Sequence, residues 1–262
     1  MISVTSAQLD AWLAAFVFPL ARILGLMSSA PLFDNAALNT QVRLIAGLAI
    51  TLAIVPALPP MPAVPVGSWG GLVILAQQVL IGILIGFSLR LAFVAIDLAG
   101  QMIGLQMGLS FAVFYDPQNA SQTPVVAEFF GLLATLIFLA LNGHLLSLSL
   151  LAQSFTLLPV STSLIASASF AKLLAWASMI FAAGVLLSLP LIAALLIANI
   201  AMGVLSRVAP QLNLFAVGFP VTILAGFVVI MISLPYFGAA LERLFERSFT
   251  AMLAIMQAAA GG

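Results

Sequence analysis

Very few residues of this chain could carry out acid–base, nucleophilic or metal chemistry. The 262 residues include one histidine (His144), no cysteine, seven Lys or Arg and seven Asp or Glu. The sequence has no second histidine to share a metal ion, no GxxxxGK phosphate loop and no GxSxG nucleophile elbow. Acidic partners for a proton relay are missing near His144, which favours a structural polar contact there. We therefore expect no enzyme activity, no cofactor and no metal site.

The side chains that stand out are instead Met and Phe, beside a polar, proline-containing segment. The sequence from Gln106 to Pro117 is QMGLSFAVFYDP. Because its Asp-Pro pair predicts that a helix ends there, Phe111 and Phe114 cannot form the lipid-facing side of a helix. They either pack in a protein core or close a passage, and a gate of flexible Met and bulky Phe would exclude ions by dewetting. The residue pattern leaves both interpretations open.

Glycines spaced by four residues precede this run. Gly82 and Gly86 form one pair, and Gly100, Gly104 and Gly108 continue the spacing. This spacing places residues on one face of a helix. A glycine face lets a neighbouring backbone approach closely, which drives helix association in lipid. We expect these five glycines to form a helix-packing seam.

Membrane helices must position these residues, because 64% of the sequence is hydrophobic and only 5% is charged. The sequence contains no charge between Arg43 and Arg90 or between Lys172 and Arg207, and each stretch can hold a span of about 20 residues. Six apolar blocks predict an all-α integral membrane protein, at about 9–29, 41–58, 69–108, 125–152, 170–205 and 214–257. With a balanced charge and a single lysine, the chain has no basic footprint for nucleic acid.

Prolines and charges interrupt these apolar blocks. Each proline inside a helix removes a backbone hydrogen bond, and the apolar blocks contain Pro19, Pro190, Pro220 and Pro235. Arg90 and Asp97 are also embedded, and such groups must face protein or water. We expect a packed assembly in which Arg90 and Asp97 find structural partners. The alternative is a secondary transporter or channel with a midplane site at the broken helices.

Several longer motifs together resemble one known family. They are Ala30-Pro31-Leu32-Phe33, IDLAGQMIG at 96–104, the Gln106 to Pro117 run, FLALNGH at 138–144, and RVAPQLNLF at 207–215 followed by Gly218-Phe219-Pro220. On these motifs nearly the whole chain resembles the FliR family, a membrane component of the flagellar type III protein export apparatus. The family is related to its counterpart in virulence injectisomes.

The resemblance implies a role in an assembly. Such proteins join FliP-like and FliQ-like subunits, with other export gate components, to form a channel for unfolded flagellar proteins in the bacterial inner membrane at the flagellar basal body. The resemblance also implies bent, packed helical hairpins in contact with membrane lipid. It further implies a FliP-like part at residues 1–160 and a FliQ-like hairpin at 161–262.

The resemblance also assigns a role to residues 106–123, which we call the plug loop. In the family this loop closes the pore before secretion, with Met107, Leu109, Phe111 and Phe114 here as its apolar residues. Arg207, Gln211 and Asn213 form a polar cluster beside Pro210. We expect them to make structural contacts between helices, because such a cluster can satisfy backbone groups freed at a helix break. The remaining alternative is a scaffold that only nucleates ring assembly.

Overall fold

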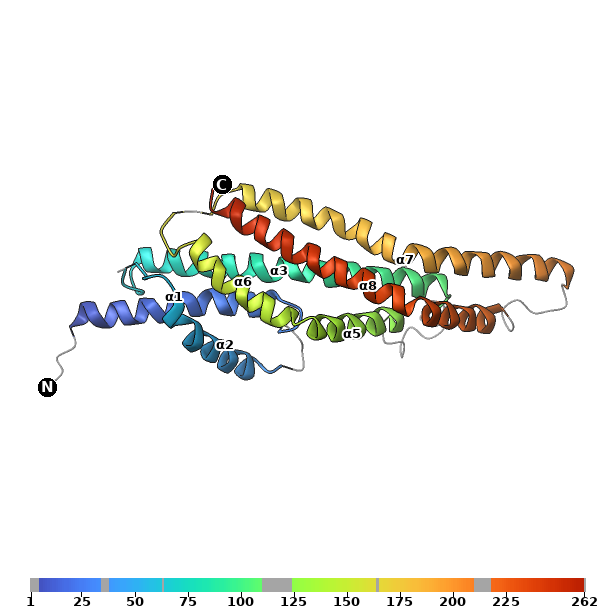
Figure 1. Cartoon of the computed structure of the whole chain (residues 1–262), viewed down its shortest axis with the longest axis horizontal. Helices are drawn as coiled ribbons and strands as arrows, with labels where there is room; N and C mark the ends of the chain where they lie inside the picture. Colours follow the sequence, from blue (N-terminus) through green and yellow to red (C-terminus); the bar gives the residue numbers. More distant parts are fainter. Residues whose placement is uncertain are drawn as a thin grey trace. The chain divides into compact units, whose positions relative to one another are not determined.

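The computed structural model describes residues 5–33, 38–62, 64–109, 124–163, 165–209 and 218–261. Every regular element within these ranges is a helix. The elements (Figure 1) are α1 (Ser6–Ser29), α2 (Thr40–Ile54), the 3-10 helix η1 (Val55–Ala57), α3 (Trp69–Gln106), α5 (Val125–Ala140), α6 (Gly143–Leu157), α7 (Ala168–Val208) and α8 (Phe219–Ala259). The predicted all-α fold is confirmed.

The apolar block at 125–152 is divided into two helices, which hydrophobicity alone did not indicate. Helix α5 ends at Ala140 and α6 begins at Gly143. Between them Asn142 adopts φ 54°, in the left-handed region, which asparagine tolerates better than most residues with a side chain. The Asn142-Gly143 pair is a common turn signal, so the break had a local sequence cause.

The four prolines in apolar sequence lie at two kinds of position. Pro19, Pro190 and Pro235 lie inside α1, α7 and α8. Pro220 is the second residue of α8, and Gly218, directly before α8, is already helical. That Pro220 removes a helical hydrogen bond stays a prediction.

Within the described parts of the chain, five helices are long and apolar enough to cross a membrane, and a sixth crossing results if α5 and α6 count as one broken span. Among them α3 has 38 residues, and α7 and α8 have 41 each. At about 1.5 Å per residue these helices rise roughly 57–62 Å, about twice the hydrocarbon thickness of a bilayer, near 30 Å. A tilt of about 20° does not remove that difference, so part of each long helix extends beyond the hydrocarbon of a flat bilayer.

The chain forms two compact units, each assembled from separate stretches. Unit 1 comprises Met1–Leu91, Asn142–Ala177 and Phe245–Gly262, and unit 2 comprises Ala92–Leu141 and Ser178–Leu244. Helices α3, α7 and α8 therefore contribute residues to both units. Within unit 1, α1 and the first part of α3 lie side by side and begin at the same end (Figure 1).

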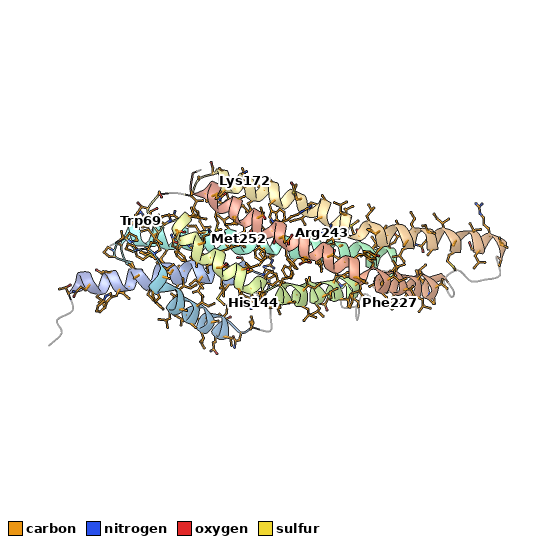
Figure 2. All side chains as sticks on the ribbon, viewed as in Figure 1. Trp69, His144, Lys172, Phe227, Arg243 and Met252 are labelled. Carbon is orange, nitrogen blue, oxygen red and sulfur yellow. The ribbon has the colours of Figure 1, made fainter. Side chains whose placement is uncertain are left out.

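The helices bury a small apolar core and leave much apolar surface uncovered. In unit 1, Ala14 and Phe18 of α1 pack with Ile74 of α3. By contrast, Leu186 and Ile197 of α7 are 68% and 69% exposed. Figure 2 shows side chains projecting outward along the long helices, with Phe227 labelled on α8. Apolar surface of this extent is typical of contact with lipid or with partner helices.

Candidate functional site

The described residues include the base of the plug loop but not most of the loop itself. Gln106, Met107 and Leu109 are described, whereas Phe111 and Phe114 lie outside the described residues. Gln211 and Asn213 also lie outside them. The geometry of the candidate site therefore comes from the two helices that enter and leave the loop, α3 and α5, and from their neighbour α8.

Met107 is buried at the point where the plug loop leaves α3. Its side chain has no exposed surface and lies against Gly226 of α8. A Cβ atom at position 226 would lie 2.5 Å from Met107 Cε and 2.8 Å from its Sδ, so any larger residue there requires the methionine side chain to move. Thr222 Oγ1 of α8 also lies 3.5 Å from the Met107 carbonyl oxygen, to which it donates.

Gly108 does not continue the helical glycine face as expected, because α3 ends at Gln106. It adopts φ 82°, a left-handed conformation that glycine takes without steric cost. Its N–H donates to Leu105 O at 3.0 Å, and the N–H of Leu109 donates to Gly104 O at 3.1 Å. This pair of bonds is the Schellman motif. Gly108 therefore terminates α3 and fixes the direction in which the plug loop departs.

The other end of the plug loop begins on α5, which packs against the glycines of α3. A Cβ atom at Gly100 would lie 2.8 Å from Ala127 N, closer than real Cβ contacts allow. At Gly104 the nearest atom would be Val126 Cβ at 3.6 Å, an ordinary contact. Both ends of residues 106–123 therefore start from helices that are in contact at these two glycines.

Aromatic contacts join α5 to α3 and α8 elsewhere in unit 2. The rings of Phe130 (α5) and Phe237 (α8) stack with centroids 4.2 Å apart. Phe138 (α5) meets Phe93 (α3) edge to face at 5.8 Å. Offset-stacked and edge-to-face pairs are favourable aromatic geometries. These contacts help to hold α3, α5 and α8 in fixed positions.

Unit 1 contains a buried cation that joins three helices. Arg22 of α1 has no exposed surface; its Nε and Nη2 donate to Gln78 Oε1 of α3 at 2.8 and 2.5 Å. Its Nη1 donates to Ser154 Oγ of α6 at 2.9 Å, and Nη2 also donates to Leu158 O at 2.8 Å. Its Cζ lies 4.0 Å from the centroid of the Phe155 ring. All of these hydrogen-bond acceptors are neutral.

The carboxyl end of α6 compensates the charge of Arg22. Leu158 is the C-cap of α6, and the carbonyls at the C-terminus of a helix carry partial negative charge. The guanidinium therefore caps α6 while it bonds to α3. Gln78 and Ser154 are 56 and 132 residues from Arg22 in the sequence, so no motif pairs them with it.

The first glycine pair of α3 contacts α1 through backbone atoms. A Cβ atom at Gly82 would lie 2.8 Å from Leu26 N, and one at Gly86 would lie 2.7 Å from Leu26 O. Gly25 of α1 is equally confined, since its Cβ would be 2.5 Å from Val79 O. At Gly25 and Gly82 the nearest atoms all belong to the backbone of the other helix, whereas at Gly86 the Ser29 hydroxyl of α1 also lies in contact.

The sequence of this chain is similar to those of known proteins. A family model described as bacterial export proteins, family 1, matches residues 13–248. Flagellar biosynthetic protein FliR of Pectobacterium carotovorum subsp. carotovorum is 43% identical over 98% of both chains, and that of Escherichia coli K12 is 42% identical over 98% of both. The chain belongs to the FliR family. The FliR of Bacillus subtilis is 26% identical over 91% of this chain and 93% of the relative.

Membership of the FliR family makes this chain a membrane component of flagellar protein export. The matched range includes both the Arg22 cluster and the Met107 base of the plug loop. The FliR assignment agrees with the resemblance inferred from the sequence motifs.

The charged residues expected to make structural contacts in this FliR family member lie on helix surfaces. Arg90 and Asp97 are exposed on α3, and Asp97 Oδ2 accepts a hydrogen bond from Gln101 Nε2 at 2.8 Å, one turn along the same helix. Arg207 is exposed in the last turn of α7, where a cation interacts favourably with the helix dipole. His144 Nδ1 is buried and has no hydrogen-bond partner among the described residues.

Proposed function

We propose that this FliR family protein helps form and seal the channel through which unfolded flagellar proteins leave the bacterium. The observation that supports this most is the base of the plug loop. One end leaves α3 at buried Met107, which packs on Gly226, and the other enters α5, which contacts Gly104 through Val126. A seal of this kind needs an apolar loop held at both ends by helices that do not move with it.

The composition of the plug loop suits a passage that must admit many sequences. Leu109, Phe111 and Phe114 contribute apolar side chains without a fixed hydrogen-bond pattern, while Met107, buried against Gly226, holds the base of the loop. An apolar constriction blocks water and ions by dewetting, yet it can part for any side chain of an unfolded substrate. Flexible methionine adapts to such changes of shape. Specific recognition of one substrate is not required for this role.

We also propose that the chain assembles with FliP-like and FliQ-like subunits in the bacterial inner membrane, at the flagellar basal body, without enzyme activity of its own. Residues 161–262 would be the FliQ-like part, because α7 and α8 form a hairpin of two long helices. Ala166 N, just before α7, donates to Ala259 O, the last residue of α8. Residues 1–160 would be the FliP-like part. The exposed apolar surfaces of α7 and α8 favour burial against other helices.

Replacing both loop phenylalanines tests the seal. The chromosomal gene would carry Phe111→Ala with Phe114→Ala, and the matched control would carry Phe111→Leu with Phe114→Leu, which keeps apolar bulk. Ion conductance, flagellar protein secretion and co-purification with FliP-like and FliQ-like subunits are measured in each strain. We expect the alanine variant to assemble but to leak ions, whereas the leucine variant stays closed.

The alternatives predict different results. If the alanine variant assembles, secretes and does not leak, the loop packs as ordinary core and the proposal is rejected. A scaffold role predicts that result in both variants. A secondary transporter predicts transport by the purified chain alone. The exposed positions of Arg90 and Asp97 on α3 give no enclosed site for such transport.

A further inference from the structure

The second half of α3 is held by neighbouring helices in two different ways. Two contacts are close approaches to backbone: Gly100 meets the backbone of α5, and a Cβ atom at Gly184 of α7 would lie 3.0 Å from Ala95 O of α3. The contact with α8 is different, because the side chain of Met107 fills the space left by Gly226. The point where α3 gives way to the plug loop is therefore held by a side chain rather than by backbone.

Two residues of α8, Thr222 and Gly226, receive Met107, and we call them the α8 seat. They are four positions apart and therefore lie on one face of the helix; Figure 2 labels Phe227, the residue after Gly226. Gly226 leaves room for the methionine side chain, and the Thr222 hydroxyl donates to the Met107 carbonyl oxygen over 3.5 Å. That distance is at the long limit for a hydrogen bond. The fit of methionine to glycine is therefore the main part of the contact.

The strength of this contact suits a reversible one. Met107 has no exposed surface, and burying a methionine side chain favours the buried form by a factor of roughly 10 to 150. A form with Met107 released into water would therefore make up about 1–10% of the molecules at rest. A substrate that binds the released form more tightly by about the same factor makes that form the commoner one. The contact is strong enough to persist at rest and weak enough to yield.

We propose that Thr222 and Gly226 are positioning residues for the plug loop: they hold its base through Met107, and Met107 leaves the α8 seat when a substrate passes. This proposal rests on the sealing function proposed above. It gives α8, in the C-terminal half of the chain, control over a loop that belongs to the N-terminal half. Gly108, in its left-handed conformation, ends α3 directly after Met107, so the movement needs no break inside the helix.

A reversible disulfide tests whether Met107 must leave the α8 seat, and the natural chain has no cysteine to interfere. The test variant carries Met107→Cys with Gly226→Cys. A Cβ atom at position 226 would lie 2.6 Å from Met107 Cγ, which is one bond of about 1.5 Å from its own Cβ, so the two Cβ atoms are at most about 4.1 Å apart. Cysteines joined by a disulfide have Cβ atoms about 3.5–4.5 Å apart. Oxidation can therefore tie the loop base to α8.

The matched control ties α3 to the same half of the chain at another point, through Leu98→Cys with Gly184→Cys. A Cβ atom at Gly184 would lie 3.2 Å from Leu98 Cβ, close to the disulfide range. Each full chain is expressed in cells with its partner subunits, and assembly is checked by co-purification. Copper phenanthroline forms the disulfides and dithiothreitol reduces them, while the loss of maleimide labelling gives the bonded fraction. Flagellar protein secretion is then measured in both redox states.

We expect secretion by the oxidised test variant to fall about ten-fold or more, because the released form is no longer accessible, and to recover on reduction. The oxidised control should secrete as before. Unchanged secretion by the oxidised test variant rejects the proposal. An equal loss in both variants rejects it too, because α3 as a whole would then have to move away from the C-terminal half.

Single cysteines give a second measurement that needs no disulfide. The maleimide labelling rate of the Met107→Cys variant should rise several-fold when substrate is being exported. Ile103→Cys, buried one turn earlier on α3, should stay protected in both conditions. Equal labelling of Met107→Cys with and without export means that the residue stays in its seat, which rejects the proposal.

The seal itself is tested separately, by Phe111→Ala with Phe114→Ala. If that variant leaks ions while the disulfide between positions 107 and 226 leaves secretion unchanged, only the role of the α8 seat is rejected. If that variant assembles and does not leak, the sealing function fails, and the proposal for the α8 seat fails with it.

Discussion

Replacing Gly82 with alanine should destabilise the contact between α1 and α3, although alanine is the better helix former. The added Cβ atom would lie 2.8 Å from Leu26 N and closer still to the Arg22 carbonyl oxygen. Both are backbone atoms, so the overlap cannot be relieved by rotating a side chain. The two helices must move apart, and the neighbouring hydrogen bonds of Arg22 to Gln78 must stretch.

The size of the effect follows from two opposing terms. Overpacking of this kind costs roughly 1–3 kcal/mol, whereas glycine to alanine inside a helix gains about 1 kcal/mol from propensity. The net free energy of unfolding should therefore fall by up to about 2 kcal/mol. Gly131 of α5 supplies a matched control, because a Cβ atom there meets nothing within 4 Å. Gly131→Ala carries the propensity gain alone, so the two variants should differ by roughly 1–3 kcal/mol.

The assay is unfolding of the full chain in mixed micelles with increasing dodecyl sulfate, followed by circular dichroism. Gly82→Ala should unfold at a lower dodecyl sulfate fraction than the natural chain, and Gly131→Ala at an equal or higher one. Equal stability of the two variants, within about 0.5 kcal/mol, would show that the backbones of α1 and α3 are not in close contact at Gly82. The proposed glycine seam would then have no energetic basis.

Two further predictions concern the buried side chains. Gly226→Ala should lower the free energy of unfolding by up to about 2 kcal/mol, because overpacking against Met107 costs roughly 1–3 kcal/mol and helix propensity returns about 1 kcal/mol. The same substitution should cost less in a Met107→Ala background, as a double-mutant cycle in the same unfolding assay can measure, and strict additivity would contradict the contact. Arg22→Ala should lower the free energy of unfolding by roughly 3 kcal/mol or more, because buried acceptors on Gln78, Ser154 and Leu158 lose their donors at about 1–3 kcal/mol each. Ser154→Ala removes only one of these acceptors and should cost about 1 kcal/mol. A larger loss of stability for Ser154→Ala than for Arg22→Ala would refute this account.

Hydrophobicity was sufficient to predict the helices but not their breaks. Five of the six apolar blocks correspond to α1, α2 with η1, α3, α7 and α8, because spans of this length have no other way to satisfy their backbone in lipid. The break at Asn142 escaped notice because a single left-handed residue changes the mean hydropathy very little.

The sequence predicted parts of the candidate site only where close packing requires one residue type, glycine. The spacing of Gly82, Gly86, Gly100 and Gly104 predicts close packing. In the structure Gly82, Gly86 and Gly100 lie against backbone atoms of a neighbouring helix, while Gly104 makes an ordinary contact with Val126. The partners on α1 and α5 could not be named from spacing. The fit of Met107 to Gly226 was invisible in the sequence, because the two positions are far apart in the chain and neither belongs to a motif of its own. The network of Arg22 was hidden in the same way.

The two kinds of contact along α3 differ in how they can respond to movement. At Gly82, Gly86 and Gly100 the neighbouring backbones touch, and such contacts have no rotatable bond through which to adapt. At Met107 the contact with Gly226 is made by a side chain with three rotatable bonds, and Gly108 ends the helix immediately afterwards. If the plug loop opens for an export substrate, the displacement is therefore expected to begin at Met107, while the glycine contacts hold α3 in place.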